Sequence, residues 1–91
     1  MTCRIDRLVT GEGLVILRII GRITGEEVAM LRAVLEQESG RVALDLIGVL
    51  LVDRDAVKLL AFHESKGAEL RNCLTYIREW VTKEADTNAA E

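Results

Sequence analysis

The chain has 91 residues, the size of one ordinary domain. Its apolar fraction of 49% and charged fraction of 30% are typical of a folded globular protein and exclude a disordered chain. The net charge is −3 and the 12 Lys and Arg residues never stand side by side, so we expect no nucleic acid partner. No signal peptide is recognisable, no apolar run approaches the roughly 20 residues of a membrane span, and cysteines are few. We therefore expect a cytoplasmic protein with no membrane contact.

The first part of the chain predicts a β-hairpin followed by a helix. Residues 4–9 mix charged and β-branched side chains, which is typical of an exposed edge strand, and residues 14–20 give the strongest β signal. A turn with two glycines separates the two runs, so we expect them to pair antiparallel. Thr24 followed by Glu27 matches a capping box and predicts a helix start, and Gly40 is expected to end that helix in the left-handed conformation.

A third strand and a second helix are predicted next. Residues 41–47 show little alternation, as expected for an interior strand. Residues 48–52 then look like a short apolar connector. Asp53 and Asp55 are both candidates for the N-cap of a helix that runs to about Lys66.

The last part of the chain predicts a short strand and a third helix. Gly67 is expected to stop the second helix, residues 69–73 to form the fourth strand, and residues 74–81 to form the helix. The polar stretch over residues 83–91 has little to bury, so a disordered tail is expected to follow a single domain of residues 1–82.

These elements predict an α/β fold with the order β-β-α-β-α-β-α and a four-stranded mixed sheet. Right-handed crossovers between sequential strands place every helix on one face of the sheet and leave the other face open. Cys3 and Cys73 then lie on opposite sheet edges, roughly 14 Å apart, which is too far for a disulfide.

The chain shows few groups suited to catalysis. The only histidine, His63, has no neighbouring nucleophile or orienting group, and with the two cysteines it matches no zinc-site spacing. No glycine-rich phosphate loop is present. We expect Asp45 to bond the backbone of a neighbouring loop, and Tyr76 and Trp80 to pack on the second helix. We therefore expect no enzyme activity, no cofactor and no metal.

Three stretches carry a resemblance to a known family: "LRIIGRITGEEVAMLRAVL", "VALDLIGVLLVDRDAVKLL" and "GAELRNCLTYIREW". In this order and spacing, from about Arg4 to Val81, the chain resembles the STAS domain, the anti-sigma-factor-antagonist family. Its Leu-Asp-Leu is similar to the family's third strand. Its Val-Asp-x-x-Ala-Val resembles the family's hydrophobic-Asp-Ser-Ser-Gly-Leu helix start.

The resemblance implies a function in bacterial signal transduction and transcription regulation. In such partner switches, the unphosphorylated antagonist binds an anti-sigma factor that is also a kinase. Phosphorylation of a serine or threonine just after the Asp breaks the complex. Here Arg54 occupies the acceptor position, with Asp55 and Ala56 after it, so no phosphorylation is expected there. Arg54 is either a docking side chain or an exposed arginine paired with a neighbouring Asp.

We therefore expect a protein-binding module whose partner is an anti-sigma factor or a kinase-like regulatory protein. The expected partner-binding residues are Arg22, Thr24, Asp53, Arg54, Asp55 and Ala56. One alternative is a scaffold or oligomerisation domain, forming a homodimer through Leu14, Ile16 and Ile20 on the open sheet face. A small-ligand sensor is the other.

Overall fold

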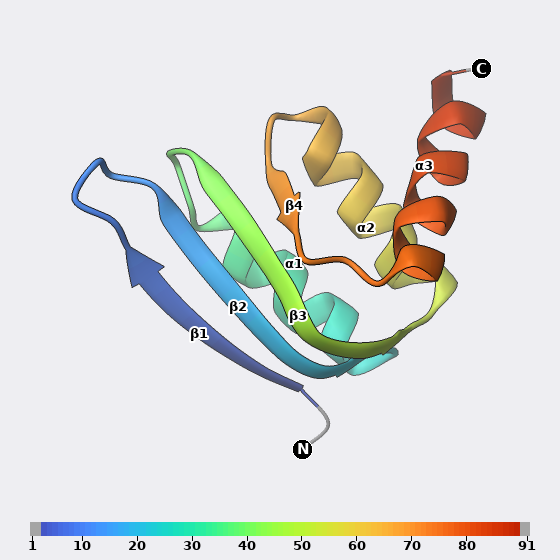
Figure 1. Ribbon diagram of the computed structural model, residues 1–91, viewed down its shortest axis with the longest axis horizontal. Coiled ribbons are helices and arrows are strands. Elements are labelled where there is room, and N and C mark those ends of the chain that lie inside the picture. The colour runs from blue at the N-terminus through green and yellow to red at the C-terminus, as the bar shows by residue number, and fades with distance from the viewer. Residues whose placement is uncertain (1–2, 90–91) are drawn as a thin grey trace.

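A computed structural model describes the backbone of residues 3–89 as four strands and three helices (Figure 1). The elements in chain order are β1 (Cys3–Val9), β2 (Val15–Ile23), α1 (Glu26–Glu36), β3 (Val42–Val52), α2 (Arg54–Ser65), β4 (Glu69–Arg71) and α3 (Thr75–Ala89). The strand order in the sheet is β1-β2-β3-β4. β1 pairs antiparallel with β2, whereas β2 pairs parallel with β3 and β3 pairs parallel with β4. The predicted order of elements and the mixed sheet are confirmed.

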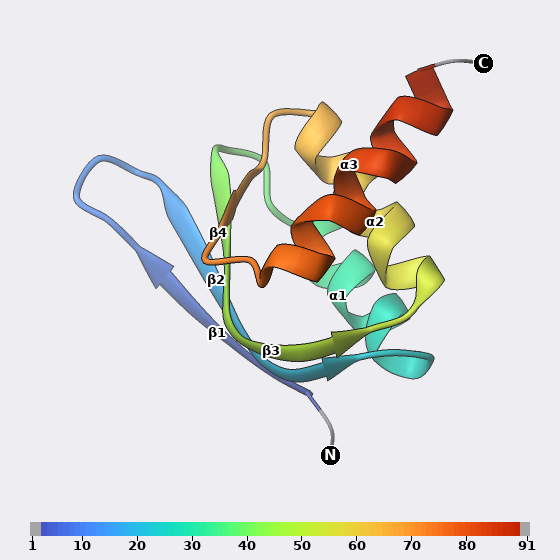
Figure 2. The same ribbon diagram turned by 45° about the vertical axis from the view of Figure 1, so that its right-hand side comes forward.

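All three helices cover the same face of the sheet, as both ribbon views show (Figures 1 and 2). In β2, Val15, Leu17 and Ile19 are buried, whereas the intervening Arg18 and Ile20 are exposed. This alternation with a period of two is expected of a strand with one face in the core and one in solvent. The largest fully buried side chains are Leu17, Ile19, Ile23, Leu31, Leu44, Leu46, Val49, Val57, Leu60, Ile77 and Val81.

β3 is longer than the sequence predicted, because residues 48–52 continue the strand instead of forming a connector. Gly48 makes this continuation feasible: a Cβ at that position would lie 2.9 Å from Cγ1 of Ile20 on the neighbouring strand. The glycine, which suggested a strand end, allows the two backbones to approach closely inside the sheet.

β3 also pairs irregularly with β2. Opposite the step from Arg18 to Ile20, β3 advances from Asp45 to Gly48, and a second register shift follows at Gly21 and Arg22. Each shift places an extra residue in β3, as in a β-bulge. As a result, Val49 and Val52 remain buried while Ile47 and Leu50 are 64% and 70% exposed.

α1 begins and ends differently from the prediction. Its N-cap is Gly25, at φ 56°, and no side chain caps it. The predicted capping box is wrong, because the Thr24 hydroxyl donates to the Glu27 carboxylate at 3.4 Å instead of accepting from a backbone N–H. The helix ends at Glu36, and Gly40 is not left-handed. Beyond the helix, Glu38 forms an ion pair with Arg7 of β1 at 2.8 Å, which fixes the chain beside the sheet.

α2 ends where predicted, at a left-handed Gly67 with φ 105°. The N–H of Ala68 donates to the carbonyl of His63, and that of Gly67 donates to the carbonyl of Glu64, each at 3.0 Å. These two bonds form the Schellman arrangement, which satisfies carbonyls at a helix end.

α3 extends past its predicted end and runs to Ala89. The expected disordered tail over residues 83–91 is therefore helical over residues 83–89, and residues 90–91 lie outside the described part of the chain. Ala85 packs against the core one turn beyond the fully buried Val81, so this segment has an apolar contact that its composition did not indicate. No helix within residues 3–89 is long and apolar enough to cross a membrane.

Candidate partner-binding site

The centre of the candidate site is the carboxylate of Asp53, which is the N-cap of α2. Its Oδ1 accepts from the N–H of Ala56 at 2.8 Å, and its Oδ2 accepts from the N–H of Gly25 at 2.9 Å. One carboxylate thus joins the starts of two helices. Hydrogen bonds from Gly25 and Ala56 hold the pKa of Asp53 below its usual value, against a smaller desolvation effect.

The parallel pairing of β2 and β3 brings the predicted site residues to one end of the sheet. Arg22 lies opposite Leu51, and Ile23 lies opposite Val52. The N–H of Asp53 donates to the carbonyl of Ile23 at 3.3 Å, which continues this pairing past the strand end. The turn after β2 and the start of α2 therefore lie side by side, as the sequence predicted.

The predicted site residues differ in their access to solvent. Arg22, Arg54 and Asp55 are exposed, Thr24 is half-buried, and Ala56 is fully buried. Ala56 can therefore support the helix packing but cannot present its side chain to a partner. The exposed members of the predicted set are Arg22, Arg54 and Asp55, and Thr24 and Asp53 are partly accessible.

Arg54 forms no ion pair with a carboxylate of the described residues. Among the described residues, the ion pairs of the protein do not include Arg54, although Asp53 and Asp55 flank it. The two carboxylate oxygens of Asp53 accept from backbone N–H groups. Asp55 lies in the first turn of α2, where the helix dipole stabilises a negative charge. The expected alternative of an Arg54–Asp pair is therefore not found, and the guanidinium is free to bind another molecule.

Sequence reasoning missed the exposed apolar residues near this end of the sheet. Ile47 and Leu50 project into solvent because of the bulges in β3, which no sequence pattern indicated. Tyr76 and Trp80 were expected to pack on α2 but are 44% and 36% exposed. The Tyr76 hydroxyl instead donates to the carbonyl of Leu50 at 2.7 Å, which connects α3 to β3.

Asp45, the buried carboxylate of β3, has a structural role. It accepts hydrogen bonds from the N–H of Ile47 at 3.1 Å and the side-chain amide of Asn72 at 3.0 Å, and Arg18 lies 3.5 Å away. The bond from Asn72 is the main cause of its lowered pKa. The sequence predicted a bond to the backbone of a neighbouring loop. In the structure, the donors to Asp45 are instead the side chain of a loop residue, Asn72, and the backbone of its own strand at Ile47.

Other reactive groups are dispersed. Cys3 and Cys73 are free and lie near opposite edges of the sheet, which confirms the prediction of no disulfide. Within the described residues, no three His, Cys, Asp or Glu side chains gather where they could hold a metal ion. A cleft of about 400 Å³ lies at the other end of β3, and the polar side chains that line it include Glu36, Arg41 and His63. Burial lowers the pKa of His63.

Strand order, helix placement and the parallel core define the STAS type of α/β fold, as the sequence predicted. The crystal structure of an antisigma-factor antagonist, a STAS domain from Rhodobacter sphaeroides, superposes with a TM-score of 0.59 at 20% sequence identity. The superposition covers 92% of this chain and 91% of that one. No family model matches the sequence, and no curated protein matches it either. The likeness therefore establishes the fold.

Proposed function

We propose that this protein is a bacterial, cytoplasmic regulatory module that binds an anti-sigma factor or a kinase-like regulatory protein. The observation that carries this proposal is the free Arg54 guanidinium, presented at the start of a helix whose position is fixed by Asp53. Loops and helix starts at one end of a rigid sheet are common contact surfaces. The solved neighbour with this fold is named as an antisigma-factor antagonist, which supports the same class of partner.

The proposed module does not switch by phosphorylation at the start of α2. By the resemblance to the STAS helix start, Arg54 stands where a hydroxyl would accept the phosphoryl group, and Asp55 follows it. A phosphoryl group would add about −2 charge at this position, whereas Arg54 holds a fixed positive charge. Mass spectrometry after incubation with source-cell extract and ATP should find no phosphate between Val52 and Val57. A phosphate in that segment would contradict this part of the proposal. If Arg54→Ser restored a phosphate, that result would support placing Arg54 at the acceptor position.

Co-purification tests the binding function directly. Tagged wild-type protein from source cells should retain a regulatory protein in stoichiometric amount. Arg54→Glu should retain much less, because the substitution reverses the positive charge at the helix start, which takes part in none of the ion pairs among the described residues. Arg32→Glu is the matched control, since Arg32 is an exposed cation of α1. Equal recovery with all three proteins would contradict the proposal.

Self-association is a second candidate function, favoured by the exposed apolar side chains of β3. Ile47 and Leu50 are 64% and 70% exposed, and Ile20 on β2 is 41% exposed. Leu14 and Ile16, which belong to the predicted dimer surface, are half-buried and therefore expose less apolar area. Sedimentation of the purified protein should show a dimer that is lost in Ile47→Glu if this function is correct, and a monomer otherwise.

A further inference from the structure

The exposed side of α2 presents a line of cations with one aromatic ring. Arg54, Lys58, Phe62 and Lys66 follow one another at four-residue spacing, and the first three are exposed residues of the helix. Side chains at this spacing lie one above another and wind slowly round the helix. The line, here called the α2 stripe, spans about 18 Å from Arg54 to Lys66.

Among the described residues, no carboxylate forms an ion pair with a cation of the α2 stripe. The ion pairs within the described residues use Arg4, Arg7, Arg18, Arg71 and Arg78. None of them uses Arg54, Lys58 or Lys66. The chain as a whole is acidic, at net charge −3, so carboxylates are plentiful elsewhere. Three unpaired cations aligned on one helix therefore form a local positive surface on an acidic protein.

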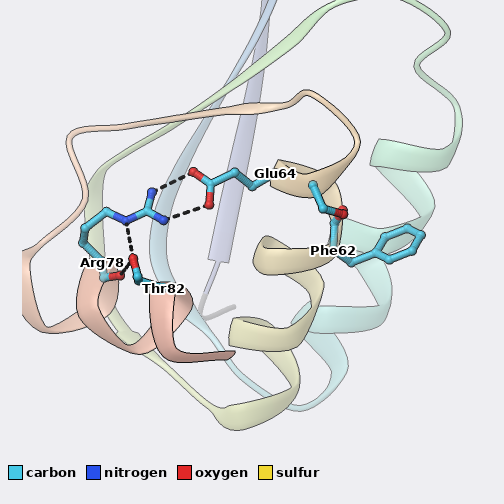
Figure 3. Close-up of polar contacts among 5 residues, drawn as sticks. Phe62, Glu64, Arg78 and Thr82 are labelled. Carbon is cyan, nitrogen blue, oxygen red and sulfur yellow. Dashed lines mark hydrogen bonds and ion pairs between the residues drawn. The ribbon is translucent and has the colours of Figure 1, made fainter. Parts of the chain in front are cut away.

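The second acidic residue of α2 is directed away from the stripe. Glu64 forms two bonds of 2.8 Å with the guanidinium of Arg78 on α3. Figure 3 shows this pair on one side of α2, with the ring of Phe62 pointing to the other side. Asp55 is therefore the only exposed carboxylate that α2 contributes near the stripe.

Phe62 gives the stripe an apolar contact. The chain contains only one Phe, one Tyr and one Trp, and this single Phe is 54% exposed instead of being buried in the core. The Lys66 ammonium lies 5.5 Å from the ring centroid, within range of a cation–π interaction. The ring of His63 meets it edge-on at 5.2 Å. The ring is thus supported by protein contacts while half of it remains free, and aromatic side chains are frequent anchors of protein interfaces.

We propose that the α2 stripe docks an acidic protein segment that places an apolar side chain on Phe62. Carboxylates of the segment would pair with Arg54, Lys58 and Lys66, which gives charge complementarity over about 18 Å of helix. This inference rests on the proposed function, because Arg54 belongs to both. It adds the chemistry of the partner and extends the contact surface along the whole of α2.

The test uses a fluorescein-labelled peptide with glutamates and leucines at helical spacing, titrated with the full chain and followed by anisotropy. Wild-type protein should bind it, and binding should weaken as salt rises. Lys58→Glu and Phe62→Ala should each lower the affinity about tenfold or more. Arg32→Glu, on α1, should change it less than about twofold. Circular dichroism confirms that each variant is folded.

Several outcomes would overturn the proposal. The wild-type protein could fail to bind the acidic peptide in a salt-dependent way, or bind equally well a peptide with lysine at each glutamate. Lys58→Glu and Phe62→Ala could also match the Arg32→Glu control. A wild-type dimer that Lys58→Glu abolishes in sedimentation would identify a second copy as the occupant.

The co-purified partner separates failure of the stripe from failure of the proposed function. If Arg54→Glu loses the partner while Lys58→Glu and Phe62→Ala retain it, the stripe proposal is wrong and the proposed function stands. If all three variants retain the partner as wild type does, both are wrong.

Discussion

Asp53 and Gly25 are 28 residues apart in the chain, yet the Asp53 carboxylate accepts the Gly25 N–H at 2.9 Å. The other oxygen of the same carboxylate caps α2 through Ala56 at 2.8 Å. Gly25 is itself the N-cap residue of α1 and has no side chain to cap that helix. The start of α1 therefore depends on a carboxylate supplied by the start of α2, and this bond fixes the end of the molecule where Arg54 is exposed.

Asp53→Ala should lower the free energy of unfolding by about 2 kcal/mol, because it removes a helix cap and leaves two backbone N–H groups without their acceptor. Urea denaturation measures the effect. Asp55→Ala is the control: Asp55 is exposed and makes no cap, so the loss should stay below about 0.5 kcal/mol. Equal losses for the two variants would show that Asp53 does not join the helices.

Stability should fall in acid partly through Asp53. Its folded pKa is lowered, first by the Gly25 N–H and then by the Ala56 N–H. The bonds therefore contribute stability above the unfolded pKa of about 4, and this contribution is lost as pH falls through the lower folded pKa. Asp53→Asn removes the titrating group. The difference in stability between this variant and wild type should therefore shrink as pH drops from about 5 to about 3, a range that spans the unfolded pKa of about 4. A difference that does not change with pH would contradict the assignment.

The sequence indicated much of the fold, and its errors have identifiable causes. The strong β signal of residues 14–20 and the glycine stop at Gly67 were local signals that the structure retains. The capping box at Thr24 failed because a distant carboxylate, Asp53, took part in the start of α1. The early end predicted for β3 failed because Gly48 was interpreted locally, whereas its role depends on Ile20 across the sheet.

The candidate site was predictable in place but not in detail. Parallel strands had to bring Arg22 and Asp53 to one end of the sheet, and they do. Which members are accessible depends on packing, so the burial of Ala56 could not be derived from its neighbours in sequence. The helical spacing of Lys58 and Phe62 from Arg54 was visible in the sequence, but their lack of ion pairs was not.

Gly48→Ala should destabilise the protein by about 1–3 kcal/mol, because its Cβ would lie 2.9 Å from Cγ1 and 3.2 Å from Cα of Ile20. Gly40→Ala is the matched control, since a Cβ there would have no atom within 4 Å and its φ is not positive. That substitution should be neutral or stabilising by up to about 1 kcal/mol. Thermal denaturation of both variants tests the close approach of β2 and β3. Equal stabilities of Gly48→Ala and Gly40→Ala would contradict that close approach.

The Glu64–Arg78 pair should couple α2 to α3 modestly. Both bonds are 2.8 Å, but the side chains are 33% and 38% exposed, so solvent screens the attraction. A double-mutant cycle with Glu64→Gln and Arg78→Met should give a coupling of about 0.5–1 kcal/mol that decreases in high salt. Zero coupling at low salt would mean that the two helices are held by apolar packing alone.

The association rate of the co-purified partner with wild-type and Arg54→Glu protein, measured at low and high salt, tests the central claim most directly. A charged side chain at the edge of an interface acts mainly on the association rate, and salt screens it. Arg54→Glu should slow association about tenfold at low salt, with a smaller effect at high salt and an almost unchanged melting temperature. Identical association rates for the two proteins at low salt would contradict binding through the start of α2.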